Sequence, residues 1–226
     1  MRLAMAARST GRWRVSLRQG DGTLLPLGSS FSFASSQSGI QPASLFAPCY
    51  VLLEGTLNTD NRIELHGSLQ WEGRSQATHE IDVSAIPAIV ADALRLTGGG
   101  LPRGLPVAAI ECKDKSSTGA PDEMRETLAR MFDLVLVTPP RPPIRPCRIY
   151  EPGTGSVWGQ RSESYRKFFS LGTFAIARVG KFSKGTRRMG THYYIIRAGN
   201  IYDPAGLAIA ELEQSFQETL TNIDQF

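Results

Sequence analysis

Apolar positions in the middle of the chain switch between the spacing of strands and that of helices. Residues 79–86 predict a strand, and a helix is expected to follow until three consecutive glycines, residues 98–100, end it. The nearly continuous apolar run 107–113 is typical of a buried strand. A short helix over 121–132 and a second buried strand over 133–138 complete the series, and this alternation of strands and helices indicates an α/β fold.

The patterns on either side of this core divide the chain into four parts. Residues 1–61 are expected to form a β-rich, partly loose N-terminal segment, and 62–138 the α/β core. Five prolines fall within residues 139–146, so we expect a rigid linker over 139–157. Residues 158–226 predict a basic C-terminal α+β extension, which is either a second lobe or a continuation of the same sheet.

Several further elements are expected outside the core. Residues 13–17 predict a strand, and the stretches on either side of a turn at 58–61 predict a hairpin. In the C-terminal extension the sequence predicts a helix near 162–172, a mobile basic loop at 181–188, strands at 191–197 and 200–202, and a last helix at 205–221.

Composition narrows the class of protein. Of the 226 residues, 41% are hydrophobic and 20% are charged, as in ordinary globular domains. The apolar runs are too short to cross a bilayer, so we expect a soluble, cytoplasmic protein with no membrane partner. Three cysteines (Cys49, Cys112 and Cys147) form no CxxC pair, which argues against a disulfide framework or a zinc site.

Charge is distributed unevenly around a net value of +4. Residues 158–200 contain nine Lys or Arg and one acid, whereas 201–226 contain five acids and no Lys or Arg. This asymmetry favours a face that binds a polyanion, through phosphate contacts that carry no sequence information. The basic residues predicted to contact nucleic acid are Arg166, Lys167, Lys181, Lys184, Arg187 and Arg188.

Two of the predicted strands carry acids where a buried strand would be apolar. Glu111 and Lys113 end one strand on the same face, about 7 Å apart along the chain direction. Asp82 interrupts the other strand, with Glu80 on its same face. A charge inside a buried strand is costly unless it is paired or metal-bound, so these residues form either a metal site or a salt bridge that closes the sheet.

The pattern Glu-Ile-Asp82 followed by Ile-Glu111-Cys-Lys113 resembles the core of the PD-(D/E)xK nuclease superfamily, in particular its resolvase-like and Mrr-like branches. The resemblance covers about residues 62–138 and implies a restriction-endonuclease-like mixed sheet flanked by helices. The sequence departs from the family in two ways. The 29-residue step from Asp82 to Glu111 contains a predicted helix where many members have a tighter hairpin, and no acid-bearing helix is evident ahead of Asp82.

The resemblance also implies a set of roles. Asp82, Glu111 and the backbone carbonyl of Cys112 would bind Mg²⁺, with Mn²⁺ as a substitute, since hard divalent ions prefer oxygen ligands. Lys113 would orient or deprotonate the attacking water and stabilise the developing negative charge. Glu80 would help through a second metal or by holding Lys113. Phosphodiester hydrolysis needs a metal for both activation of water and charge neutralisation.

Taken together, these features predict a Mg²⁺-dependent nuclease that hydrolyses DNA in preference to RNA, in restriction and phage defence or in DNA repair and recombination. Cutting a duplex usually requires two such sites in this superfamily, which favours a homodimer. A separate recognition or activator subunit would leave no signature in this chain. The alternative is a non-catalytic nucleic-acid-binding or assembly subunit that keeps the nuclease fold. A third hypothesis, a small-molecule enzyme of unrelated fold, requires a deep apolar pocket.

Overall fold

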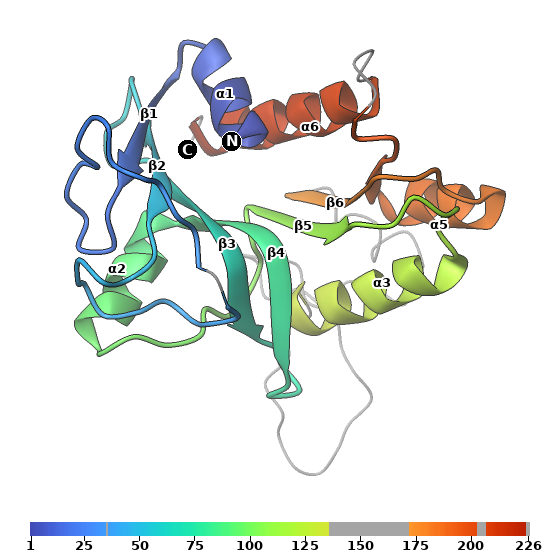
Figure 1. The fold of residues 1–226 in the computed structure, drawn as a ribbon, viewed down its shortest axis with the longest axis horizontal. Helices are drawn as coiled ribbons and strands as arrows, with labels where there is room; N and C mark the ends of the chain where they lie inside the picture. Colours follow the sequence, from blue (N-terminus) through green and yellow to red (C-terminus); the bar gives the residue numbers. More distant parts are fainter. Residues whose placement is uncertain (35, 136–171, 203–206, 225–226) are drawn as a thin grey trace.

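One mixed sheet of seven strands runs through the computed structural model, with the strands in the same order in the sheet as in the chain (Figure 1). The structure describes residues 1–34, 36–135, 172–202 and 207–224. The sheet therefore joins segments from both ends of the sequence into a single frame. Within the described residues, no helix combines the length and the apolar character that a bilayer crossing requires.

Five strands form consecutive antiparallel pairs, namely β1 (Trp13–Arg18), β2 (Tyr50–Gly55), β3 (Arg62–Glu72), β4 (Thr78–Pro87) and β5 (Ala108–Lys113). The last two strands, β6 (Thr173–Arg178) and β7 (Ile196–Ala198), extend the sheet in parallel from β5. Parallel neighbours need a crossover connection between them. Accordingly, α3 (Pro121–Val135) follows β5 in the chain and α5 (Lys184–Tyr193) follows β6.

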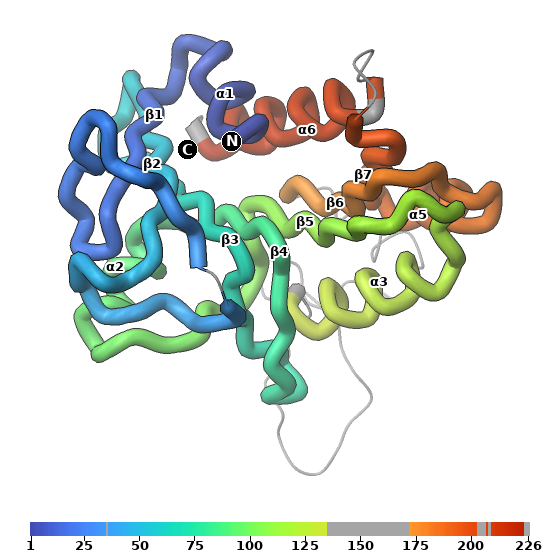
Figure 2. Tube along the Cα trace, viewed as in Figure 1, coloured from blue at the N-terminus to red at the C-terminus, as the bar shows by residue number. Residues whose placement is uncertain are grey.

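Helices cover both faces of the sheet, as the ribbon and the Cα trace show (Figures 1 and 2). The first face carries α1 (Arg2–Ser9) and α6 (Leu207–Asp224), and the second carries α3 and α5. On β5, Ala108 and Ile110 enter the core under α1 and α6, whereas Ala109 enters the core under α3. Because β5 and β6 are covered on both sides, their sequences are almost continuously apolar.

Much of the predicted core is confirmed. The α/β class, the mixed sheet and the flanking helices are present, and β4, α2 (Ala88–Leu96) and β5 follow the predicted order of strand, helix and strand. The predicted strand at 13–17 is β1, and the predicted hairpin is formed by β2 and β3. The C-terminal segment continues the sheet, because β6 and β7 pair next to β5.

The predicted strand at 133–138 is wrong over its first residues. There α3 continues to Val135, because Leu128, Met131 and Leu134 keep helical spacing and all are buried against the sheet. The strand that pairs in parallel with β5 is β6 instead. Residues 136–138, the linker at 139–157 and the helix near 162–172 lie outside the described residues.

Three predictions in the C-terminal segment are also wrong, in whole or in part. The basic stretch beginning at Lys184 is helical, since Ser183 caps α5 by accepting a hydrogen bond from the backbone N–H of Thr186. Of the predicted strand at 191–197, residues 191–193 are instead the end of α5, which stops where Tyr194 takes a left-handed conformation with φ of 56°, and residues 196–197 belong to the strand β7. The helix α1 has no counterpart among the predicted elements, and residues 200–202 form no strand.

A buried polar cluster ties β3 to α2. Glu64 is 1% exposed, and its carboxylate accepts hydrogen bonds from both terminal nitrogens of Arg95, at 2.8 and 2.6 Å. Nε2 of His66 lies 2.8 Å from the same carboxylate, and the guanidinium of Arg95 stacks 4.5 Å above the ring of Tyr50. Burial opposes ionisation, but the hydrogen bonds from His66 and Arg95 hold the pKa of Glu64 below its ordinary value.

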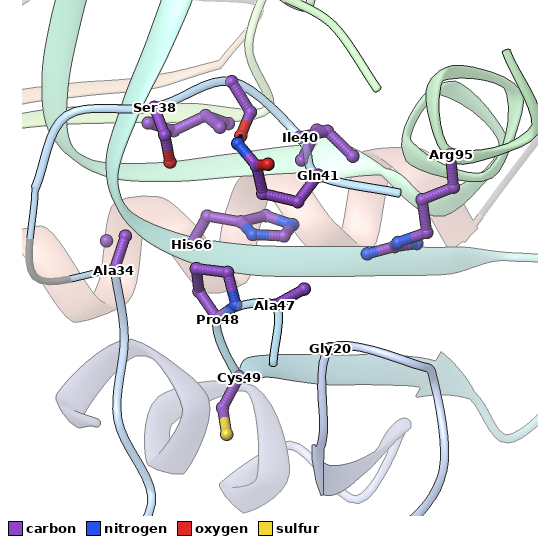
Figure 3. A pocket seen from close by; sticks show the side chains of 13 residues that line it. Gly20, Ala34, Ser38, Ile40, Gln41, Ala47, Pro48, Cys49, His66 and Arg95 are labelled. Atoms are coloured by element: carbon purple, nitrogen blue, oxygen red, sulfur yellow. Dashed lines mark hydrogen bonds between the residues drawn. The ribbon is translucent and has the colours of Figure 1, made fainter. Parts of the chain in front are cut away.

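A small cavity of about 30 Å³ borders this cluster, with His66 and Arg95 among its lining residues (Figure 3). The sulfur of Cys49 points away from the His66 ring in this view, so the two side chains do not form a nucleophile–base pair. At about 30 Å³ this cavity cannot hold a small-molecule substrate; a larger hollow of about 600 Å³, with Ile63, Pro87 and Leu105 in its lining, lies elsewhere. The cluster is therefore a stabilising feature of the fold.

Arg95→Met should lower the free energy of unfolding by about 3 kcal/mol or more, because it leaves the Glu64 carboxylate buried without its main counter-ion. Urea unfolding at pH 7 measures this. Arg62→Met is the matched control, since Arg62 pairs with Asp92 on the surface and its loss should cost less than about 1 kcal/mol. Equal effects of the two substitutions would contradict the assignment.

Candidate functional site

The predicted acids meet where β4 and β5 separate. These two strands pair over only three positions, Val83–Ala85 with Ala108–Ile110, whereas β5 stays paired with β6 as far as Lys113. Past the separation point, the backbone N–H of Cys112 donates to the Asp82 carboxylate at 2.5 Å. The Asp82 side chain thus bridges the gap that opens between the two strands.

An interruption in the ladder between β3 and β4 positions Asp82. The register between these strands is continuous except opposite Asp82, where Ser68 has φ of 49°, in the left-handed region. On one side of the interruption Val83 packs under α1 and α6, and on the other Ile81 packs under α3. The side-chain alternation therefore shifts at Asp82, which remains half-buried between the two cores. A non-glycine residue at such a φ costs on the order of 1 kcal/mol, and such costs are concentrated at functional sites.

Glu111 is the most deeply buried acid of this site, with 2% of its surface exposed. Nη1 of Arg130, on α3, lies 3.0 and 3.1 Å from its two oxygens, and Nζ of Lys113 lies 3.3 Å from Oε2. Burial raises the pKa of Glu111 above its ordinary value, Arg130 and Lys113 oppose that rise, and the nearby Asp82 carboxylate adds to it. The site thus combines two carboxylates with two cationic side chains.

The donor chemistry of this site fits a hard divalent cation. Asp82, Glu111 and the backbone carbonyl of Cys112 offer oxygen ligands, and Mg²⁺ needs only one or two protein carboxylates when waters and phosphates complete its shell. Within the described ranges, no group of three or more His, Cys, Asp or Glu side chains gathers to hold a metal by itself. Two carboxylates and one carbonyl could supply part of the shell of Mg²⁺ or Mn²⁺, but they would not by themselves complete it.

The remaining predicted residues have separate surroundings. The carboxylate of Glu80 accepts a hydrogen bond from the side chain of Gln37, while Lys113 contacts Glu111. Lys181, Lys184, Arg187 and Arg188 are exposed on α5 and the loop before it, on the same face of the sheet as α3. None of the four forms an ion pair with another described residue, so their charges face solvent. Arg166 and Lys167 lie outside the described residues.

Sequence reasoning missed Arg130, which is the second cation on Glu111. The signal was its position on α3, one residue before the buried Met131 and three after the buried Thr127, on the flank of the helix that meets the sheet. A basic residue at the edge of the buried face of a helix can reach an acid on the strand beneath the helix. That strand is β5, and the acid is Glu111.

A second ion pair fixes the start of α3 to β6. Arg178 is fully buried, its Nη1 lies 3.2 Å from a carboxylate oxygen of Glu123, and its Nη2 donates to the carbonyl of Lys115 at 3.3 Å. Gly119 lies so close to the guanidinium that a Cβ at this position would collide with it. Glu123 is therefore a partner of Arg178, and the pair anchors the loop that follows the site.

The chain matches no protein-family model, no curated protein and no solved structure. Any function assigned to it accordingly rests on its own residues and their geometry.

Glu123→Gln should lower the free energy of unfolding by about 3–5 kcal/mol, because the buried guanidinium of Arg178 would lose its counter-ion. Asp122→Asn, at the adjacent exposed position, removes only a surface pair with Arg125 and should cost less than about 1 kcal/mol. Thermal and urea unfolding of both variants provide the test. A near-neutral Glu123→Gln would mean that Arg178 needs no carboxylate partner.

Proposed function

We propose that this chain is a metal-dependent nuclease of the restriction-endonuclease-like type, with DNA as its substrate. The observation that carries the proposal is the meeting of Asp82, Glu111 and Lys113 at the gap between β4 and β5. Two further features support it. The acids belong to antiparallel neighbouring strands of a mixed sheet, and a helix that follows the second strand contributes another cation to the site.

The division of labour among the residues follows from their surroundings. Asp82 and Glu111 would hold Mg²⁺ together with the Cys112 carbonyl, and the bound ion would supply charge neutralisation and an acidified water. Lys113, whose Nζ already lies beside the Glu111 carboxylate, would hold the attacking water in line or accept its proton. A cation in this position also stabilises the negative charge that builds on the phosphoryl oxygens.

Substrate binding is assigned to the exposed cations on α5 and the loop before it. Lys181, Lys184, Arg187 and Arg188 form no ion pair among the described residues, so they can neutralise phosphates without first breaking an internal ion pair. Phosphate contacts of this kind hold a backbone but do not read bases. The proposal therefore assigns no sequence preference to this surface.

A second candidate function has its own supporting observation. Arg130 and Lys113 already neutralise the Glu111 carboxylate, so the four charges could be a purely structural network in a non-catalytic DNA-binding subunit. Such a subunit would bind DNA equally well with and without Mg²⁺, and Glu111→Ala would leave its DNA binding unchanged.

Lys113→Ala should reduce cleavage of supercoiled plasmid or labelled single strands in Mg²⁺ or Mn²⁺ by about 100-fold or more, because it removes the group beside the attacking water. Wild type should cut with either metal and not in EDTA. Arg125→Gln, an exposed change on α3, should cut like wild type. DNA retention without cutting under every condition would favour the binding subunit, and neither cutting nor retention would contradict both functions.

Replacing Lys184, Arg187 and Arg188 together by alanine should weaken DNA binding uniformly across sequences. The slope of log affinity against log salt should become shallower by about 0.9 for each phosphate that the variant no longer neutralises. Fluorescence anisotropy at several salt concentrations measures both quantities. The double variant Arg14→Ala/Arg62→Ala, with exposed cations on β1 and β3, is the control and should leave the slope unchanged. An unchanged slope in the triple variant would rule out this surface.

A further inference from the structure

Arg130 holds Glu111 in an unusual way. A single nitrogen, Nη1, approaches both carboxylate oxygens, at 3.0 Å from Oε1 and 3.1 Å from Oε2. The other guanidinium N–H groups have no protein acceptor among the described residues, and the side chain is 36% exposed. Among the described residues, Arg130 is therefore held by Glu111 alone, and part of its side chain is open to solvent.

Lys113 and Arg130 differ in which carboxylate oxygens of Glu111 they contact. Lys113 contacts Oε2, whereas Arg130 is the one described partner of Oε1. Lys113 also belongs to the same strand as Glu111, two residues away, and its side chain is only 21% exposed. Departure of Arg130 would thus free one carboxylate oxygen of Glu111 while Lys113 kept the other.

Charge balance indicates what would drive such a departure. Without a metal, the carboxylates of Asp82 and Glu111 are matched by Lys113 and Arg130. A divalent cation would add two positive charges, so its binding is opposed as long as Arg130 stays on Glu111. A phosphate group near the ion would restore the balance and offer the guanidinium a two-pronged acceptor.

From this geometry we propose that Arg130 is an exchangeable counter-ion of the site. A divalent cation displaces it from Oε1 of Glu111, and the released guanidinium then binds a phosphate of the nucleic acid. Arg130 thus couples metal binding to substrate binding. This inference rests on the proposed metal-dependent function.

The first part of the proposal, displacement of Arg130 by the metal, is tested by Mn²⁺ binding in the absence of nucleic acid. Electron paramagnetic resonance measures the bound fraction. Arg130→Gln should bind Mn²⁺ about tenfold more tightly than wild type, because the competing cation is gone. Arg125→Gln, on the exposed side of the same helix, should bind Mn²⁺ like wild type. An affinity in Arg130→Gln equal to or weaker than that of wild type would overturn the proposal and make Arg130 a purely structural partner of Glu111.

A measurement on the wild-type chain covers the case in which Arg130→Gln fails to fold. In spectra of arginine-labelled protein, the guanidinium resonances of Arg130 should shift as Mg²⁺ is added, while those of Arg125 should stay in place. Unchanged Arg130 resonances at saturating Mg²⁺ would overturn the exchange.

The second part of the proposal, binding of a phosphate by Arg130, is tested by DNA affinity. The measurement uses a Lys113→Ala background, which prevents cutting. Adding Arg130→Gln should weaken DNA binding about tenfold in Mg²⁺ and leave it unchanged in EDTA, where Arg130 stays on Glu111. Equal DNA affinities in Mg²⁺ would overturn the phosphate contact.

Mn²⁺ binding distinguishes failure of the proposed metal site from failure of the proposed exchange. If neither wild type nor Arg130→Gln binds Mn²⁺, the proposed metal site is wrong and the exchange falls with it. If both bind Mn²⁺ with the same affinity, the metal site stands and only the exchange is wrong.

Discussion

The carboxylate of Glu111 is buried at the centre of the candidate site, with 2% of the residue exposed. Burial raises the pKa of this group, and the cations of Lys113 and Arg130 offset the cost of a negative charge there. The apolar packing of α3 on the sheet brings Arg130 within reach of this carboxylate. Glu111 also lies beside the opening where β5 leaves β4, and that opening admits the Asp82 side chain.

The sheet supplies the opening through a change of partner. β5 leaves β4 after three paired residues but remains paired with β6, so one edge of its last residues is free to accept a side chain. At the same level, Ser68 and Asp82 interrupt the neighbouring ladder and shift its side chains from one core to the other. The two irregularities coincide at Asp82.

The sequence alone was sufficient for the strands and helices whose period is unambiguous, such as β4, α2 and β5. The sequence was insufficient where the same apolar pattern is compatible with both a strand and a helix. Leu134 fits a buried strand or the end of a helix equally well, and the packing of α3 on the sheet decides for the helix. Asp82, Glu111 and Lys113 stood out because they interrupt apolar strands. Arg130 did not stand out, because an arginine on a helix is usually exposed to solvent. Only the tertiary fold brings this one to Glu111.

The position of a bound metal ion in the protein tests the proposed site of Asp82 and Glu111 without relying on activity. Anomalous diffraction from crystals grown with Mn²⁺ would locate the ion. We expect a single strong peak between the carboxylates of Asp82 and Glu111, close to the Cys112 carbonyl, with Arg130 withdrawn from Glu111. Absence of a peak at saturating Mn²⁺, with Arg130 still on Glu111, would contradict the proposed metal site and leave the four charges as a structural network.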